Sequence, residues 1–351
     1  MGFFDNLRRS ANTLLNDQTN SGRDNEESAV TKEDDPQEET SLDDQEEESF
    51  VDDDMRIEKV EVVEREIEEE ELPPVDEEPA YKEIHSYAEK KPVTHVIGQT
   101  KIVAIINQKG GVGKSTTAIN LAAALGEMNK EVLLVDLDPQ GNATSGLGID
   151  KGQIPRCVYD VLLNDVPVED VIIPDVCEGL DIIPATINLA GAEVELVSEM
   201  ARENRLRDAV GSLRGKYDYI LIDCPPSLGL LTVNALVAAD KLIIPIQCEF
   251  YALEGVTKLL DSMKRVKTRL NPSLDIYGIL LTMYDGRTTL SKQVVREVRN
   301  YFGKEVFETV IPRTVKLSEA PSYGMPITQY DPTGKGAQSY VKLAKEVISR
   351  G

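Results

Sequence analysis

A glycine-rich segment with two lysines is the part of the sequence best suited to chemistry. It reads Lys109-Gly110-Gly111-Val112-Gly113-Lys114-Ser115-Thr116, and it fits the phosphate-binding pattern G-x-x-x-x-G-K-S if Gln108 stands in place of the first glycine. Glycines let backbone N–H groups turn toward phosphate oxygens at the start of a helix, where the helix dipole favours negative charge. Lys114 would reach the β- and γ-phosphates, and the Ser115 hydroxyl would bind Mg²⁺. We therefore expect a nucleotide site at this loop.

Three aspartates at the ends of predicted strands are candidates for the rest of the site. Asp136 and Asp138 follow the apolar run 132–135, and Asp223 follows the run 219–222. A buried apolar strand rarely carries an unpaired carboxylate, so a nearby cation is the simplest explanation. Asp136 and Asp223 are predicted to hold Mg²⁺ together with Ser115, and Asp138 is predicted to orient the attacking water. Taken singly, each aspartate could instead cap a helix.

The elements that must position these residues alternate along the chain after Gly98. Short β-branched runs predict buried strands, and the amphipathic stretches between them predict helices. The predicted strands are Ile102–Ile106, Val132–Leu137, Leu180–Ile183, Tyr219–Ile222, Leu242–Ile246 and Ile276–Thr282, and the predicted helices are Ser115–Met128, Ala190–Leu213, Leu228–Ala238, Ala252–Leu270, Lys292–Phe302 and Gly336–Ser349. This alternation indicates an α/β fold with a doubly wound, mostly parallel sheet. Such sheets bind ligands beyond the carboxyl ends of their strands.

The motifs together resemble one family. The loop has the extra lysine Lys109, and the segments Asp-Leu-Asp-Pro-Gln-Gly-Asn-Ala-Thr (136–144) and Asp-Cys-Pro-Pro-Ser-Leu-Gly (223–229) follow it. They resemble the deviant Walker A ATPases of the ParA/MinD superfamily, specifically the ParA/Soj chromosome and plasmid partition proteins. The segments 285–288 and 311–321 also look like the ParA pattern. The resemblance covers about residues 101–349.

The resemblance implies an enzyme that hydrolyses ATP with Mg²⁺ and dimerises around the nucleotide. In this family the lysine at the position of Lys109 crosses the dimer interface to the partner's phosphates, so Lys109, Lys114 and Asp138 are the expected catalytic residues. ATP is expected to contact the glycine-rich loop and, near its adenine, three more residues. The expected ATP contacts are Lys109, Gly110, Gly111, Val112, Gly113, Lys114, Ser115, Thr116, Met283, Pro312 and Arg313.

Non-specific DNA binding and a ParB-like partner are also implied by the resemblance. The positions that match the family's DNA contacts are Arg287, Arg313 and Lys316. Basic side chains crowd the predicted helices 292–302 and 252–270 as well, although ordinary solvated helix faces look the same. The expected location is the cytoplasm, on the nucleoid, and the expected partner is a centromere-bound ParB-like protein that stimulates hydrolysis.

Charge divides the chain into two unequal parts. Residues 1–99 hold 31 Asp and Glu against 10 Lys and Arg, and residues 100–351 hold 31 against 28, out of 62 acidic and 38 basic residues in all. The net charge of −24 therefore belongs mainly to the N-terminal part. We expect residues 17–95 to form a disordered acidic linker and residues 96–351 to form the ATPase domain. The four cysteines lie far apart, so neither a zinc site nor a disulfide framework is expected.

Residues 1–16 differ from the acidic linker. Phe3, Phe4, Leu7, Ala11, Leu14 and Leu15 fall on one side of a helix drawn at about 100° per residue. A helix this short would form only against a membrane, a partner or the chain's own domain. A MinD-like ATPase that uses this segment to bind a membrane is therefore the alternative function. An iron–sulfur relative would need bridging cysteines that the sequence does not offer.

Overall fold

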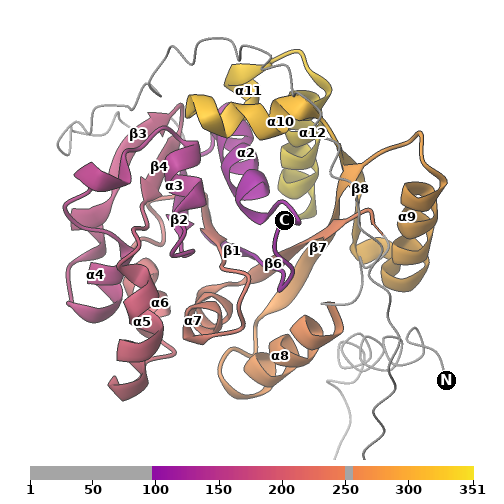
Figure 1. Cartoon of the computed structure of the whole chain (residues 1–351). Coiled ribbons are helices and arrows are strands. Elements are labelled where there is room, and N and C mark those ends of the chain that lie inside the picture. The colour runs from indigo at the N-terminus through magenta and orange to yellow at the C-terminus, as the bar shows by residue number, and fades with distance from the viewer. Residues whose placement is uncertain (1–96, 250–255) are drawn as a thin grey trace, which may run out of the picture. The chain divides into compact units, whose positions relative to one another are not determined.

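The structure, a computed structural model, describes residues 97–249 and 256–351. These residues build one eight-stranded sheet in the order β3-β4-β2-β5-β1-β6-β7-β8 (Figure 1). The strands are β1 (Lys101–Ile105), β2 (Val132–Asp136), β3 (Ile173–Cys177), β4 (Leu180–Ile183), β5 (Tyr219–Asp223), β6 (Lys241–Gln247), β7 (Asp275–Tyr284) and β8 (Val306–Pro312). All neighbouring strands are parallel except β3 and β4. The predicted α/β class with a mostly parallel sheet is confirmed.

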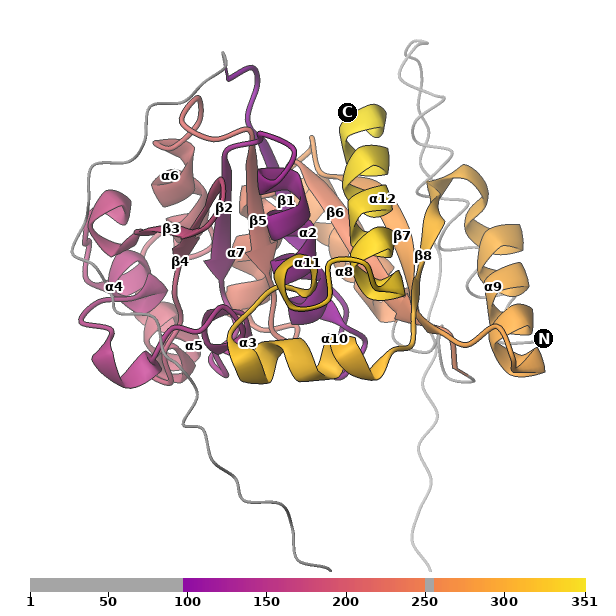
Figure 2. The ribbon, with the colours of Figure 1, turned by 90° about the horizontal axis from the view of Figure 1, so that it is seen from above.

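Helices cover both faces of the sheet (Figures 1 and 2). One face carries α2 (Lys114–Gly126), α3 (Asn142–Gly146), α10 (Val315–Glu319), α11 (Ile327–Tyr330) and α12 (Lys335–Arg350). The other carries α4 (Val158–Leu163), α5 (Leu189–Glu195), α6 (Arg205–Gly211), α7 (Leu230–Ala238), α8 (Val256–Arg269) and α9 (Thr289–Phe302). Short 3₁₀ segments are η1 (Lys151–Gln153), η2 (Val168–Val171), η3 (Leu196–Ser198), η4 (Gly303–Glu305) and η5 (Ala320–Tyr323).

The central strands send alternate side chains into two cores. In β1, Ile102 and Ala104 pack on one face, whereas Val103 and Ile105 pack on the other. A strand buried on both faces must be apolar throughout, which is why its sequence is an unbroken hydrophobic run. The parallel register also sets Asp136 of β2 directly beside Asp223 of β5. The two acids therefore meet at the carboxyl edge of the sheet, next to the strand that leads into the glycine-rich loop.

The predicted helix Ala190–Leu213 is wrong as one element. The structure has α5 and η3, then a break, and then α6. The break is stabilised by Asn234 of α7, whose Nδ2 donates to the Arg202 carbonyl at 2.8 Å and whose Oδ1 accepts from the Leu206 N–H at 3.1 Å. A side chain about 30 positions away in the sequence thus satisfies the backbone at the start of α6, which a local helical pattern cannot reveal.

The other predicted elements lie close to the observed ones, with ends that differ by a few residues. For the predicted helix Ala252–Leu270, the described part is α8. The edge strands β3 and β8 were not predicted, because charged residues interrupt both of their sequences. The predictions for residues 1–16 and 17–95 lie outside the described residues. Over the described ranges, no helix combines the length and the apolar character needed to cross a bilayer.

Candidate functional site

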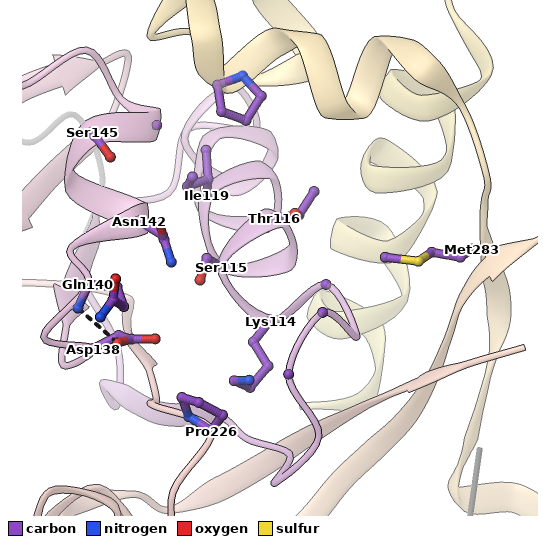
Figure 3. A pocket seen from close by; sticks show the side chains of 15 residues that line it. Lys114, Ser115, Thr116, Ile119, Asp138, Gln140, Asn142, Ser145, Pro226 and Met283 are labelled. Carbon is purple, nitrogen blue, oxygen red and sulfur yellow. Dashed lines mark hydrogen bonds between the residues drawn. The ribbon is translucent and has the colours of Figure 1, made fainter. Parts of the chain in front are cut away.

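A cavity of about 510 Å³ opens at the carboxyl edge of the sheet, beside the N-terminus of α2 (Figure 3). Its size is typical of small-molecule sites, which run from about 300 to 1,000 Å³. The lining residues come from the glycine-rich loop, α2, α3, the loops after β2 and β5, the end of β7, and η5. They are Gly110, Gly111, Gly113, Lys114, Ser115, Thr116, Ile119, Asp138, Gln140, Asn142, Ser145, Gly146, Pro226, Met283 and Pro321.

The glycine-rich loop is held in shape by hydrogen bonds at both ends. At its start, Asn107 Nδ2 donates to the Pro245 carbonyl at 2.7 Å, and Asn107 Oδ1 accepts from the Lys109 N–H at 3.0 Å. Further on, Thr282 Oγ1 of β7 donates to the Val112 carbonyl at 2.9 Å. Gly113 has φ of 87°, a left-handed conformation that glycine adopts without strain. The loop is therefore preformed around the cavity, with backbone N–H groups available to an anion.

Lys114 places a cation at the floor of the cavity. Its residue is 7% exposed, and its Nζ donates to the Lys109 carbonyl at 3.4 Å. Burial lowers the pKa of Lys114, while the nearby carboxylates of Asp223 and Asp138 act in the opposite direction. In Figure 3 the Lys114 side chain extends between Asp138 and Pro226. The ammonium therefore lies where phosphate oxygens in the loop would neutralise it.

Asp223 is a fully buried carboxylate at the carboxyl end of β5. Its residue is 0% exposed, and within the described part of the chain neither carboxylate oxygen has a hydrogen-bond partner. Burial raises the pKa of Asp223 well above its usual range, and Asp136 raises it further. The Ser115 hydroxyl and the Lys114 ammonium lower that pKa, although Ser115 makes no hydrogen bond to Asp223. An unsatisfied buried carboxylate beside a hydroxyl fits Mg²⁺, which prefers oxygen ligands.

Asp136 and Asp138 lie near Asp223 but differ from it in accepting hydrogen bonds from the chain. Both oxygens of Asp136 accept hydrogen bonds from the chain, from Thr144 and from the Asp138 N–H. Burial raises the pKa of Asp136 to about 6, even though these hydrogen bonds pull it down. Asp138 lines the cavity, and its Oδ1 accepts from the Gln140 N–H at 3.0 Å (Figure 3).

The structure brings most of the predicted nucleotide residues together, with exceptions. Met283 lines the cavity with an unusual φ of 52°, whereas Lys109, Val112, Pro312 and Arg313 are not part of its lining. Seven lining residues are absent from the predicted site residues: Ile119, Gln140, Asn142, Ser145, Gly146, Pro226 and Pro321. Three of them had a signal in the sequence, because Gln140, Asn142 and Pro226 belong to the motifs that carry the resemblance.

The three residues predicted to bind DNA lie in the segments after β7 and β8. Their side chains are 90%, 66% and 54% exposed for Arg287, Arg313 and Lys316. Each has an acidic neighbour: Arg287 pairs with Asp285 at 2.7 Å, Arg313 with Glu249 at 3.5 Å and Lys316 with Glu319 at 2.8 Å. Ion pairs as exposed as these are screened by water and stabilise the fold little, so a phosphate can replace the carboxylate at little cost.

Comparison with known proteins agrees with this geometry. Residues 100–276 match the family model described as an AAA domain. The chain is 59% identical to the sporulation initiation inhibitor protein Soj of Bacillus subtilis over 251 residues, which are 72% of this chain and 99% of that protein. It is 56% identical to the chromosome partitioning protein ParA of Myxococcus xanthus over 250 residues, which are 71% of this chain and 88% of that protein.

Two solved structures share the fold and hold nucleotide. One, titled cobyrinic acid a,c-diamide synthase from Mycobacterium smegmatis with bound ADP and magnesium, is 41% identical with a TM-score of 0.63 over 71% of this chain and 94% of its own. The other is the septum site-determining protein MinD of Pyrococcus horikoshii with Mg-ADP, 32% identical with a TM-score of 0.59 over 71% of this chain and 96% of its own. The chain therefore belongs to the ParA/Soj family of partition ATPases in the ParA/MinD superfamily, and its ligands are ATP and Mg²⁺.

Proposed function

We propose that this partition ATPase dimerises around ATP, binds DNA without sequence preference in that state, and is released when a ParB-like partner stimulates hydrolysis. The observation that carries the ATP-dependent part is the buried Asp223 carboxylate beside the preformed loop, which accepts no hydrogen bond from residues 97–249 or 256–351. The Lys114 ammonium lies near enough to lower the pKa of Asp223, but within the described residues the carboxylate oxygens accept no hydrogen bond, so they are open to the metal of an entering Mg-ATP. Nucleotide state would then be coupled to the shape of the loops around the cavity.

The residues of the cavity have distinct roles in this proposal. The loop from Gly110 to Thr116 binds the phosphates through its N–H groups, and Lys114 balances charge on the β- and γ-phosphates. Ser115 and Asp223 hold Mg²⁺, which supplies positive charge to the phosphate oxygens when bound. Asp136, which the sequence also predicts as a Mg²⁺ ligand, is left out of this set because both of its oxygens accept hydrogen bonds from Thr144 and the Asp138 N–H. Asp138 orients the attacking water at the open side of the cavity. Met283 lies at the far end of the cavity from Asp138, where the base would bind (Figure 3).

Two features support a second copy of the chain on the nucleotide face. Within the described residues, Lys109 forms no ion pair, so its ammonium is available to another chain. Exposed apolar side chains also follow the carboxyl ends of several strands near the cavity: Ile187 after β4, Leu228 after β5, and Val315, Tyr323 and Met325 after β8. Several large apolar groups exposed around one site favour a protein partner there. Apposed nucleotide faces would bury them and bring each Lys109 to the partner's phosphates.

DNA binding is supported by the exposure of Arg287, Arg313 and Lys316 at the same edge of the sheet. We expect retention on non-specific DNA with ATP, and loss of retention with ADP or after Arg287→Ala. Affinity should fall steeply with salt, because phosphate contacts release counterions. Lys216→Ala is the matched control for loss of one positive charge, because Lys216 is an exposed lysine paired with Glu169 at the amino end of β5, away from the basic helices. Equal retention with ADP and ATP would contradict the nucleotide switch.

The alternative is a membrane-associated ATPase that uses residues 1–16. The amphipathic pattern of Phe3, Phe4, Leu7, Leu14 and Leu15 favours it, and these residues lie outside the described part of the chain. Flotation of the full chain with anionic vesicles, compared with a Phe4→Asp variant, tests this function. Flotation of the full chain that Phe4→Asp abolishes would support membrane association, and its absence in both would remove it.

A further inference from the structure

The carboxylate of Asp136 is occupied by donors of its own chain. Asp136 Oδ2 accepts hydrogen bonds from the Thr144 N–H at 2.8 Å and from the Thr144 hydroxyl at 2.7 Å. Asp136 Oδ1 accepts from the Asp138 N–H at 3.2 Å. Asp223, the neighbour in the sheet register, has no such donors in the described residues. The two adjacent aspartates therefore have different roles, because Asp223 is open to a cation and Asp136 already binds the segment that contains Thr144.

Thr144 connects segments that follow two different strands. Its hydroxyl donates to Asp136 at the end of β2 and accepts from the Ala185 N–H, just beyond β4, at 3.0 Å. A hydroxyl has one hydrogen to donate and lone pairs to accept with, and both capacities are used here. Thr144 is 0% exposed and is not part of the cavity lining. It acts on the site only through the helix that carries it.

That helix depends on such contacts for its position. α3 is five residues long, and its N-cap Gly141 has no side chain that could cap it. A single turn is not stable from its own hydrogen bonds. The same turn carries Asn142 and Ser145 into the cavity, and Asp138 lies just before it. Misplacing groups of this kind by about 1 Å can lower a reaction rate about 100-fold.

We propose that Thr144 is a positioning residue for ATP hydrolysis, which fixes the segment 138–146 against the buried Asp136 carboxylate and the end of β4. The glycine-rich loop is held separately, through Asn107 and Thr282. Loss of the Thr144 hydroxyl therefore releases the side of the cavity that orients water and leaves the phosphate-binding side in place. The proposal separates turnover from nucleotide binding.

The test compares three variants of the full chain. Thr144→Val keeps the shape of the side chain and removes the hydroxyl, and Thr144→Ser restores it. Thr100→Val is the matched control, because the Thr100 hydroxyl is also buried, donates to the Tyr217 carbonyl at 2.7 Å and accepts from the Gly215 N–H at 2.7 Å. Thr100 lies at the other end of β1, away from the cavity. It makes the same two kinds of hydrogen bond without contact to α3.

We expect Thr144→Val to lower kcat about 10- to 100-fold. The Kd for Mg-ADP should stay within about threefold of the wild-type value, which corresponds to about 0.7 kcal/mol of binding free energy. Thr144→Ser should restore kcat, and Thr100→Val should keep the wild-type kcat. Hydrogen exchange over residues 138–147 should accelerate in Thr144→Val alone. The mass of the dimer with a non-hydrolysable ATP analogue is measured in parallel, so that a loss of association is recognised as such.

An unchanged kcat in Thr144→Val, or an equal fall in Thr100→Val, would overturn the proposal. A kcat that Thr144→Ser does not restore would also overturn it. If Thr144→Val does not fold, the wild-type protein provides the measurement. The amides of Thr144 and Ala185 must then exchange as slowly as those of β2 in the absence of nucleotide, and fast exchange at both would refute the anchoring.

Discussion

Replacing Asp223 with asparagine should stabilise the nucleotide-free protein while it weakens the binding of Mg-ATP. The carboxylate is fully buried and has no hydrogen-bond partner in the described residues. An unsatisfied buried polar group costs about 1 to 3 kcal/mol, and more if it is charged. For about 250 folded residues, 1 kcal/mol corresponds to about 2 to 4 °C in Tm. Asparagine keeps an unpaired polar group at this position but carries no charge, so relief of a charge penalty of about 1 to 3 kcal/mol should raise the Tm of the nucleotide-free protein by about 2 to 12 °C.

The dependence on pH has a definite sign. The pKa of Asp223 is raised in the folded protein, so the charged form is disfavoured there relative to the unfolded chain. The penalty is absent below the unfolded pKa of about 4 and grows as the pH rises toward the folded pKa. The stability gained in Asp223→Asn should therefore be larger at pH 8 than at pH 5.

Calorimetric unfolding with and without Mg-ATP is the assay. Asp181→Asn is the matched control, because Asp181 is also buried but accepts from the Tyr217 hydroxyl at 2.6 Å and from the Asp175 N–H at 3.0 Å. Removing charge from a satisfied carboxylate should lower the Tm. The reasoning would be refuted if Asp223→Asn lowered the Tm of the nucleotide-free protein as much as Asp181→Asn does, or if Mg-ATP still raised its Tm as in the wild type.

Three further outcomes are expected. Gly113→Ala should abolish nucleotide binding and lower the free energy of unfolding by about 1 to 2 kcal/mol, because a φ of 87° strains a residue that has a Cβ. Calorimetric titration measures the binding, and urea unfolding measures the stability. Asn234→Ala should lower the free energy of unfolding by about 1 to 3 kcal/mol, because the Arg202 carbonyl and the Leu206 N–H lose their hydrogen-bond partner. Hydrogen exchange over residues 199–206 should become faster. All four cysteines are buried: Cys157, Cys177, Cys224 and Cys248. Burial also raises the pKa of Cys224 and Cys248. A thiol reagent at pH 8 should therefore modify the four cysteines only after denaturation.

The site could be predicted from the sequence where its chemistry is local. The loop 109–116 contains its own glycines, lysine and hydroxyl, and the strands before it and before Asp223 are unbroken apolar runs. A parallel sheet then brings their carboxyl ends together, so the motifs alone were enough to place Lys114, Asp138 and Asp223 near each other. The same logic accounts for the six strands that were predicted.

The remaining features depend on contacts between distant segments. Pro321 reaches the cavity from η5, about 200 residues beyond Lys114 in the sequence, and no local pattern indicates it. The break before α6 depends on Asn234, and the different tasks of Asp136 and Asp223 depend on Thr144. The edge strands β3 and β8 carry polar residues because one side of each is unpaired, which hides the apolar signature of a buried strand.

The most direct test of the proposed function is the association of a hydrolysis-blocked chain. Asp138→Ala should form a dimer with ATP and remain a monomer with ADP, as measured by light scattering after size exclusion. Adding Lys109→Ala to Asp138→Ala should leave a monomer that still binds ATP, because the lysine acts across the interface. A double variant that dimerises with ATP as well as Asp138→Ala does would contradict the central claim that each chain contributes a cation to its partner's nucleotide.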